Sequence, residues 1–145
     1  MNTIKSVLIA NRGEIAIRIS KTLNEMGIEA YGVYSKDDRS GTHLSYCSKV
    51  FALSGIGPSA YLNMDEILSI TKNNKIGAIH PGYGFLSENQ SFASACLENQ
   101  IVFIGPNEKI LKTFGDKEKA KKTSSKIRFT NMFVGRANRE KVGYT

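Results

Sequence analysis

The stretch Val7–Leu8–Ile9–Ala10–Asn11–Arg12–Gly13–Glu14 joins an uninterrupted apolar run to a turn, and a segment of helical period follows it. A short apolar run of this kind is typical of a strand buried on both faces of a parallel sheet. Residues 14–26 then carry an apolar stripe, made of Ile15, Ile19, Leu23 and Met26, and an opposite charged stripe, made of Glu14, Arg18, Lys21 and Glu25. The stretch therefore predicts a strand, a tight turn and an amphipathic helix.

The same alternation continues along the chain. We expect further strands at 30–34, 49–53, 77–79 and 101–104, and further helices at 64–72, 87–97 and 108–114. Gly27 is placed to end the first helix, and Ser87 with Gln90 forms a capping-box pattern at the start of a later one. Alternating strands and helices favour an α/β fold, a Rossmann-like parallel sheet with helices on both faces.

The composition is that of an ordinary globular domain, with 145 residues, 41% of them hydrophobic and 23% charged. It excludes collagen, coiled coil and wholesale disorder. The net charge of +7 is concentrated near the C-terminus: residues 1–115 hold 11 basic and 10 acidic side chains, and residues 116–145 hold 9 and 3. We expect a folded domain over 1–122 and a basic, divergent and disordered tail over 123–145. A nucleic-acid-binding arm or a disrupted reading frame are the alternatives for that tail.

Cysteines and termini carry little functional signal. Cys47 and Cys96 are expected to be free thiols, since no CxxC spacing and no disulfide framework is present. No apolar run approaches the roughly 18 residues of a membrane span, and no signal sequence precedes the first strand. These features predict no membrane contact and a cytoplasmic location, or the mitochondrial matrix if a transit peptide is missing.

Two loops that follow strands are candidate ligand sites. The loop at 11–14 has one glycine and an acidic residue in the first helical turn, so a dinucleotide site is disfavoured. The loop at 80–89, HPGYGFLSEN, follows a strand at the edge where open α/β sheets bind ligands. Its glycines allow a close backbone approach, and Tyr83 between them is the side chain most suited to project into a site. A purely structural role for this loop remains open.

Two further motifs are weak on their own. Lys117 follows the apparent glycine turn at Gly115–Asp116 and is a possible phosphate contact. The acidic pair Asp37–Asp38 is better interpreted as part of a solvated loop than as a metal site.

Taken together, these stretches resemble the biotin carboxylase family. The resemblance covers roughly residues 4–120 and rests on stretches that occur in the family's order: 7–16, 61–63, 79–89, 103–106 and 115–117. It implies the family's N-terminal, pre-ATP-grasp α/β domain. It also implies the family's reaction, in which ATP and bicarbonate carboxylate biotin through carboxyphosphate, with magnesium ions neutralising the phosphates. In the family, biotin carboxyl carrier and carboxyltransferase components of acyl-CoA, pyruvate and urea carboxylases are the partners.

The resemblance assigns roles to five residues. Lys117 matches the lysine that contacts ATP, and Tyr83 with Gly84 matches a loop at the edge of the biotin and carboxyphosphate pocket. Arg18 and Lys21 match positions of a homodimer interface on the first helix. Lys21 stands where relatives often have arginine, so it keeps the charge and loses the bidentate fork. No catalytic residue and no metal ligand is assigned.

The chain departs from the family after Lys122, where a strand that leads into the ATP-grasp domain is expected. The glycine-rich ATP lid, the metal-binding carboxylates and the catalytic arginine are not recognisable. Since catalysis needs several positioned groups, we expect the isolated chain to be inactive and to bind ATP, magnesium and biotin weakly or not at all. The alternative is a non-catalytic module that pairs with an intact carboxylase subunit.

Overall fold

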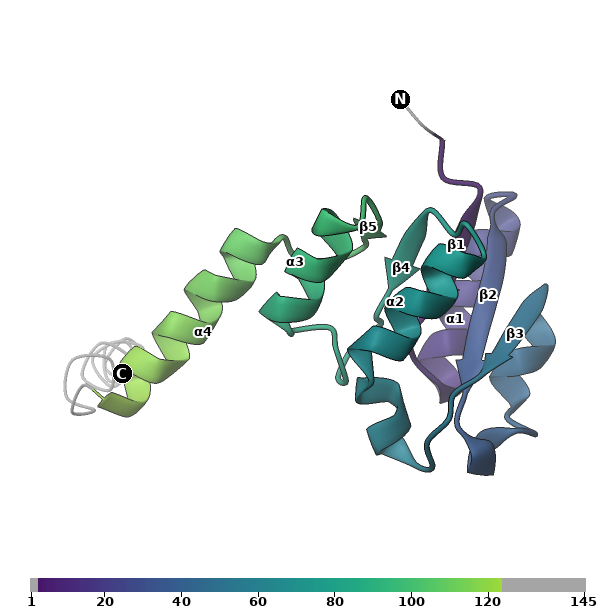
Figure 1. Ribbon diagram of the computed structural model, residues 1–145, viewed down its shortest axis with the longest axis horizontal. Helices are drawn as coiled ribbons and strands as arrows, with labels where there is room; N and C mark the ends of the chain where they lie inside the picture. Colours follow the sequence, from purple (N-terminus) through teal and green to yellow (C-terminus); the bar gives the residue numbers. More distant parts are fainter. Residues whose placement is uncertain (1–2, 124–145) are drawn as a thin grey trace, which may run out of the picture. The chain divides into compact units, whose positions relative to one another are not determined.

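The computed structural model describes residues 3–123, with the backbone alone described at 114 and 117–123 (Figure 1). In chain order the elements are β1 (Ser6–Ile9), α1 (Gly13–Glu25), β2 (Glu29–Tyr34), η1 (Lys36–Asp38), η2 (Thr42–Tyr46), β3 (Lys49–Ala52), η3 (Pro58–Leu62), α2 (Met64–Asn73), β4 (Ala78–His80), α3 (Gln90–Glu98), β5 (Val102–Phe103) and α4 (Glu108–Thr123). The η elements are short 3₁₀ turns. None of the helices within 3–123 has the length and apolar character that a membrane crossing requires.

The five strands form one parallel sheet in the order β3-β2-β1-β4-β5 (Figure 1). The first strand lies at the centre, paired with β2 on one side and with β4 on the other. Strands and helices alternate as the sequence predicts, so the expected α/β class is confirmed.

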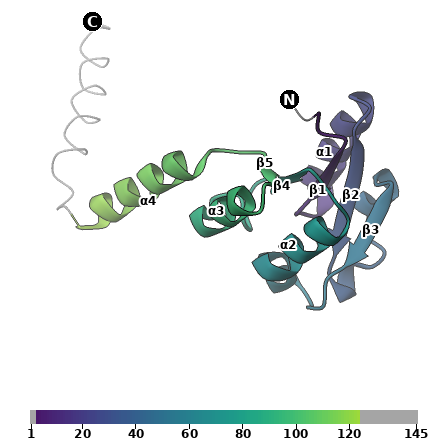
Figure 2. The same ribbon diagram turned by 45° about the horizontal axis from the view of Figure 1, so that its top comes forward.

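The sheet has a separate hydrophobic cluster on each face. On one face, Val7 and Ile9 of β1 pack with Ile19 and Leu23 of α1. On the other, alternate β1 residues join apolar side chains of α2 and α3, a cluster that includes Leu8, Ala10, Ile67, Phe92 and Cys96. Both views show α1 and α2 on opposite sides of the strands (Figure 2). A central strand buried in this way needs apolar residues at every position, which explains its unbroken apolar run.

The chain divides into two compact units between Leu111 and Lys112. The first unit contains the whole sheet, helices α1 to α3 and the first turn of α4. Of the second unit, the structure describes residues 112–123, which continue helix α4. The expected basic tail therefore lies almost entirely outside the described residues, and its predicted disorder stays a prediction.

The apolar stripe of α1 is rotated from the predicted one. Ala16 and Ser20 are buried beside Ile19 and Leu23, whereas Met26 is 65% exposed. Met26 follows the last helical residue, and Gly27 after it has a φ of 72°, so the helix ends there and the chain turns into β2. The small Ser20 is accepted in the interior because its hydroxyl donates to the Ala16 carbonyl oxygen at 2.8 Å.

The predicted start of α3 at Ser87 is wrong, because the helix begins at Gln90. Asn89 caps it, and its side-chain oxygen accepts a hydrogen bond from the Phe92 N–H at 2.9 Å. Before the cap, Phe85 has a φ of 42° and Ser87 donates its N–H to the Gly84 carbonyl oxygen at 2.9 Å. Residues 85–88 therefore form a turn that keeps the loop after β4 three residues longer than the capping-box pattern indicates.

The predicted glycine turn before Lys117 is also wrong, because α4 continues through Gly115 to Thr123. A glycine ends a helix readily when it takes a positive φ, and Gly115 does not. Inside a helix it costs only about 1 kcal/mol relative to alanine. The end of the apolar pattern at Phe114 is therefore not the end of the helix.

Core packing of β1 gives a first prediction. Leu8 has no exposed surface, and Leu97 on α3 is 71% exposed. We expect Leu8→Ala to lower the free energy of unfolding by about 2–5 kcal/mol, because it leaves a cavity between the sheet and α2. The matched Leu97→Ala change should stay within about 0.5 kcal/mol of the wild type. Urea unfolding followed by circular dichroism measures both, and equal losses would contradict this account of the core.

Candidate functional site

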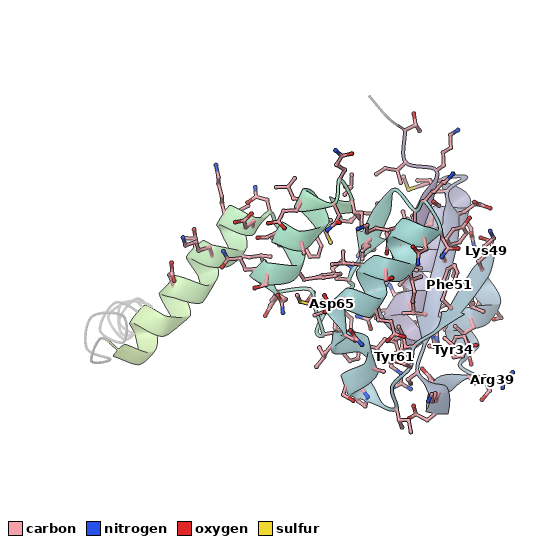
Figure 3. The ribbon with its side chains drawn as sticks, in the orientation of Figure 1. Tyr34, Arg39, Lys49, Phe51, Tyr61 and Asp65 are labelled. Carbon is pink, nitrogen blue, oxygen red and sulfur yellow. The ribbon has the colours of Figure 1, made fainter. Side chains whose placement is uncertain are left out.

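The candidate site lies at the carboxyl end of the sheet, where the strand order reverses. From β1 the chain passes through α1 to β2, whereas β4 lies on the opposite side of β1. The loops after β1 and β4 therefore leave neighbouring strands toward different faces. In open α/β sheets this switch point is where ligands bind. Tyr34, the last residue of β2, and Tyr61 of η3 lie at this same end (Figure 3).

Asn11 connects the two loops. Its side chain is 3% exposed, and its Nδ2 donates one hydrogen bond to the Pro81 carbonyl oxygen and one to the Tyr83 carbonyl oxygen, each at 2.8 Å. Its Oδ1 accepts the Arg12 N–H at 2.8 Å. A buried amide with both N–H groups and its oxygen paired is held in one orientation. Asn11, the second residue after β1, thus fixes the loop after β4.

The backbone of that loop is shaped to receive the Asn11 amide. Gly82 has a φ of 66°, and a Cβ built on it would lie 2.7 Å from Asn11 Nδ2. Only glycine accommodates both conditions without displacement. The Gly82 N–H in turn donates to Nδ1 of His80 at 3.0 Å. Burial lowers the pKa of His80, which favours the neutral ring that this acceptor role requires.

An ion pair adjoins this network. Arg12 Nε donates to Asp38 Oδ2 at 2.8 Å, with the arginine side chain 45% and the aspartate side chain 15% exposed. The hydrogen bond that Arg12 donates to Asp38 holds the pKa of Asp38 below its ordinary value, and the same bond raises the pKa of Arg12. The interpretation of Asp37–Asp38 as a solvated loop is therefore wrong for Asp38, which is ion-paired across the turn. Asp37 is exposed and accepts the Gly57 N–H at 2.7 Å.

Tyr61 connects Asp38 of the ion pair to Phe85 in the loop after β4. It is fully buried, and its hydroxyl donates to Asp38 Oδ2 at 3.0 Å. The oxygen of the Tyr61 hydroxyl also accepts the Ser35 N–H at 3.3 Å. Burial raises the pKa of the phenol, so it stays a neutral donor. Its ring stacks on Phe85, with centroids 5.1 Å apart. The loop is held by Asn11 at residues 81–83 and by Tyr61 at residue 85.

The residues that the sequence nominated fall into three places. Tyr83 and Gly84 lie together on the loop after β4, where Tyr83 is 68% exposed. Arg18 and Lys21 are exposed on α1. Lys117 is in the second unit on α4, and its side chain lies outside the described residues. Tyr83 and Gly84 thus share one loop, and the roles of all five nominated residues stay predictions.

Arg18 borders an apolar groove of about 470 Å³ on the α1 side of the sheet, with Ile4, Ile15, Met26, Ile28 and Ile104 among its lining residues. Its guanidinium has no ion-pair partner within the described part of the chain. Lys21 instead has its ammonium over the ring of Tyr46, 5.2 Å from the centroid. The two nominated interface residues therefore differ in their contacts: Lys21 lies over the Tyr46 ring, whereas Arg18 has no ion-pair partner within the described residues.

Two observations bear on the cofactors that the resemblance implies. Within the described residues there is no group of three or more His, Cys, Asp or Glu residues that could hold a metal ion. The cavity of about 390 Å³ beside the N-terminus of α1 includes Glu14, Asp38 and Arg12 in its lining. Its two carboxylates disfavour a phosphate there. The exposed Tyr83–Gly84 stretch is the part of the switch point suited to face a ligand.

Sequence reasoning missed the residues that hold the site in place. It quoted Asn11 and Arg12 only as parts of a turn and Tyr61 only as part of a familiar stretch. A polar residue directly after a buried strand was the available signal for Asn11. Nothing in the pattern indicated that Asp38 and Tyr61 would meet, because 23 residues separate them.

Fold and site define a Rossmann-like domain with a glycine-containing loop at its switch point. The sequence matches the family described as "Biotin carboxylase, N-terminal domain" over residues 3–111. The chain is 50% identical to pyruvate carboxylase of Bacillus subtilis over 127 residues, 86% of this chain and 11% of that protein. It is 44% identical to biotin carboxylase 1 of Bacillus subtilis over 124 residues, 83% of this chain and 27% of that protein.

A solved structure agrees with the sequence relatives. The biotin carboxylase domain of a single-chain bacterial carboxylase superimposes with a TM-score of 0.76 at 43% identity, covering 80% of this chain and 27% of that one. The chain therefore belongs to the biotin carboxylase N-terminal domain family, and it spans between a tenth and about a quarter of the length of these relatives.

The Tyr61 network gives a second prediction. Tyr61→Phe removes the hydroxyl that donates to Asp38, and it leaves the buried Ser35 N–H without its acceptor. We expect a loss of about 1–3 kcal/mol in the free energy of unfolding, the usual cost of an unpaired buried polar group. Tyr83→Phe removes the same atom from an exposed side chain and should change stability by less than about 0.5 kcal/mol. Equal effects in urea unfolding would show that the network does not hold the loop.

Proposed function

We propose that this chain is the N-terminal domain of a biotin carboxylase, whose longer form uses ATP and bicarbonate to carboxylate biotin. The observation that carries the proposal is the family match over residues 3–111, together with the rigid loop at the switch point. In this proposal Tyr83 and Gly84 form the edge of the biotin and carboxyphosphate pocket. Lys117 contacts ATP, for which it supplies a point charge toward phosphate. The domain comprises residues 1–122, followed by a basic tail at 123–145.

The same reasoning makes the 145-residue chain inactive by itself. ATP would supply the activating phosphoryl group, and magnesium would neutralise its charge. The described residues hold no carboxylate cluster for that metal. Transition-state stabilisation needs several positioned charges, and one lysine cannot replace them. The biotin carboxyl carrier and carboxyltransferase components would be partners of the longer protein, which we place in the cytoplasm.

A third prediction tests this proposal. The purified 145-residue chain should show no bicarbonate-dependent ATP hydrolysis with free biotin above the buffer rate. The gene product isolated from its native cells should have an intact mass well above the 16.0 kDa of this chain. ATP hydrolysis by the chain alone would contradict the predicted inactivity. A native mass near 16 kDa would instead favour a short, separate module.

The alternative function is a non-catalytic module that pairs through α1, either with its own copy or with an intact carboxylase subunit. The observation that favours pairing is the uncommitted Arg18 beside an apolar groove of about 470 Å³. Apolar surface next to a free charge is the composition of a specific interface. Retention of a full-length carboxylase by the tagged chain at near-physiological salt would support the heteromeric form.

A fourth prediction concerns this pairing. Arg18→Glu reverses a charge at the proposed interface, so it should weaken self-association by about tenfold or more. Lys72→Glu makes the same change of charge on α2, away from the groove, and should leave association unchanged. Sedimentation at several concentrations measures both variants against the wild type. A monomeric wild-type chain at every concentration, or equal weakening by both variants, would contradict a homodimer through α1.

A further inference from the structure

The conformation of the loop at 81–84 depends on the side chain of Asn11, which lies in the loop after β1. The Asn11 side-chain amide donates two hydrogen bonds to this loop, one to the Pro81 carbonyl oxygen and one to the Tyr83 carbonyl oxygen, each at 2.8 Å. The two bonded carbonyls belong to the Pro81–Gly82 and Tyr83–Gly84 peptides. The amide therefore fixes the orientation of two peptide planes at once, from a position 70 and 72 residues earlier in the chain.

The orientation of these peptides decides what the loop presents outward. In a trans peptide the carbonyl and the N–H point in opposite directions, and the structure contains no cis peptide. Because the Tyr83 carbonyl points to Asn11, the Gly84 N–H points away from it. That N–H has no acceptor among the residues described in the structure. The Gly82 N–H also points away from Asn11, and it donates to Nδ1 of His80.

We propose that Asn11 is a positioning residue for the pocket edge at Tyr83 and Gly84. It acts by clamping the Pro81 and Tyr83 carbonyls inward, which holds the Tyr83 side chain and the Gly84 N–H toward the outside. Its own amide is buried and hydrogen-bonded to Pro81, Tyr83 and Arg12, so it acts through the loop and is not a catalytic residue. The purpose of the clamp rests on the proposed function, whereas the clamp itself is a property of the chain and can be measured without substrates.

Two substitutions of Asn11 separate hydrogen bonding from packing. Asn11→Asp keeps the shape of the side chain but removes both N–H donors, and it places an oxygen against two carbonyl oxygens. Asn11→Ala removes the whole amide. If the clamp acts through its donors, the aspartate variant should loosen the loop at least as much as the alanine variant. If Asn11 only fills space, the aspartate variant should behave like the wild type.

The first measurement uses the ¹⁵N-labelled 145-residue chain at pH 7.5. We expect both variants to lower the heteronuclear NOE of Gly82 and Gly84. We also expect them to raise the rate of chymotrypsin cleavage after Tyr83 by about tenfold or more, since lost hydrogen bonds make local opening easier. Ser20→Ala removes a buried hydrogen bond on α1 and controls for a general loss of stability. It should change neither readout by more than about twofold.

A second pair of variants keeps the test valid if the Asn11 variants do not fold. Gly82→Ala and Gly84→Ala both place a side chain at a positive φ, 66° and 68°, so their backbone strain is matched. Only the Cβ at Gly82 would meet the Asn11 amide, at 2.7 Å, whereas nothing lies within 4 Å of a Cβ at Gly84. Gly82→Ala should therefore lower the melting temperature more than Gly84→Ala.

The outcomes distinguish the clamp from the proposed function. Wild-type loop order and cleavage in Asn11→Asp, or equal melting temperatures for the two glycine variants, would overturn the clamp whatever the chain does. A loosened loop in both Asn11 variants, with Ser20→Ala unchanged, supports it. None of these readouts uses ATP, bicarbonate or biotin, so a failure of the carboxylase proposal would leave the result on Asn11 standing.

Discussion

Burial of β1 on both faces is the constraint from which the other elements take their places. Residues 7–10 are between 0% and 1% exposed, so each side of the strand must be covered by apolar side chains. Helix α1 covers one face, and α2 with α3 covers the other. At about 25 cal/mol per Å² of apolar surface, this double burial is the main stabilising contribution that a central strand can make. It also brings the residue after β1 to the switch point of the sheet.

Rigidity of the candidate site follows from that placement. Once Asn11 lies beneath the loop after β4, a buried amide must find hydrogen-bond partners, and the carbonyls of that loop are the groups within reach. Arg12, the next residue, is directed outward and pairs with Asp38, which joins Tyr61 and through it Phe85. Asn11 thus holds the start of the loop directly, and Arg12 is linked to its middle through Asp38 and Tyr61. An exposed stretch on a fixed frame suits a pocket edge, because binding then orders little that is mobile.

Sequence patterns predicted the elements far better than their ends. Every predicted strand and helix exists, because apolar period reports which residues face the core. The ends failed where another force decided them. Asn89, and not Ser87, caps α3, since the chain first completes the turn around Phe85. Helix α4 passes through Gly115 because backbone hydrogen bonds continue where the apolar stripe stops. For the candidate site, the sequence nominated Tyr83 and Gly84 but not Asn11 and Tyr61, which contact their loop.

The sequence by itself determined the α/β class, the strand–helix order and the family, because these depend on local period and on motifs of consecutive residues. It also nominated the Tyr83–Gly84 stretch. Only the tertiary structure decided that Asn11 clamps that stretch, that Asp38 is ion-paired, and that Arg18 rather than Lys21 is uncommitted. These contacts join residues from about 20 to more than 70 positions apart, and their energies depend on distance and burial, which no local pattern encodes.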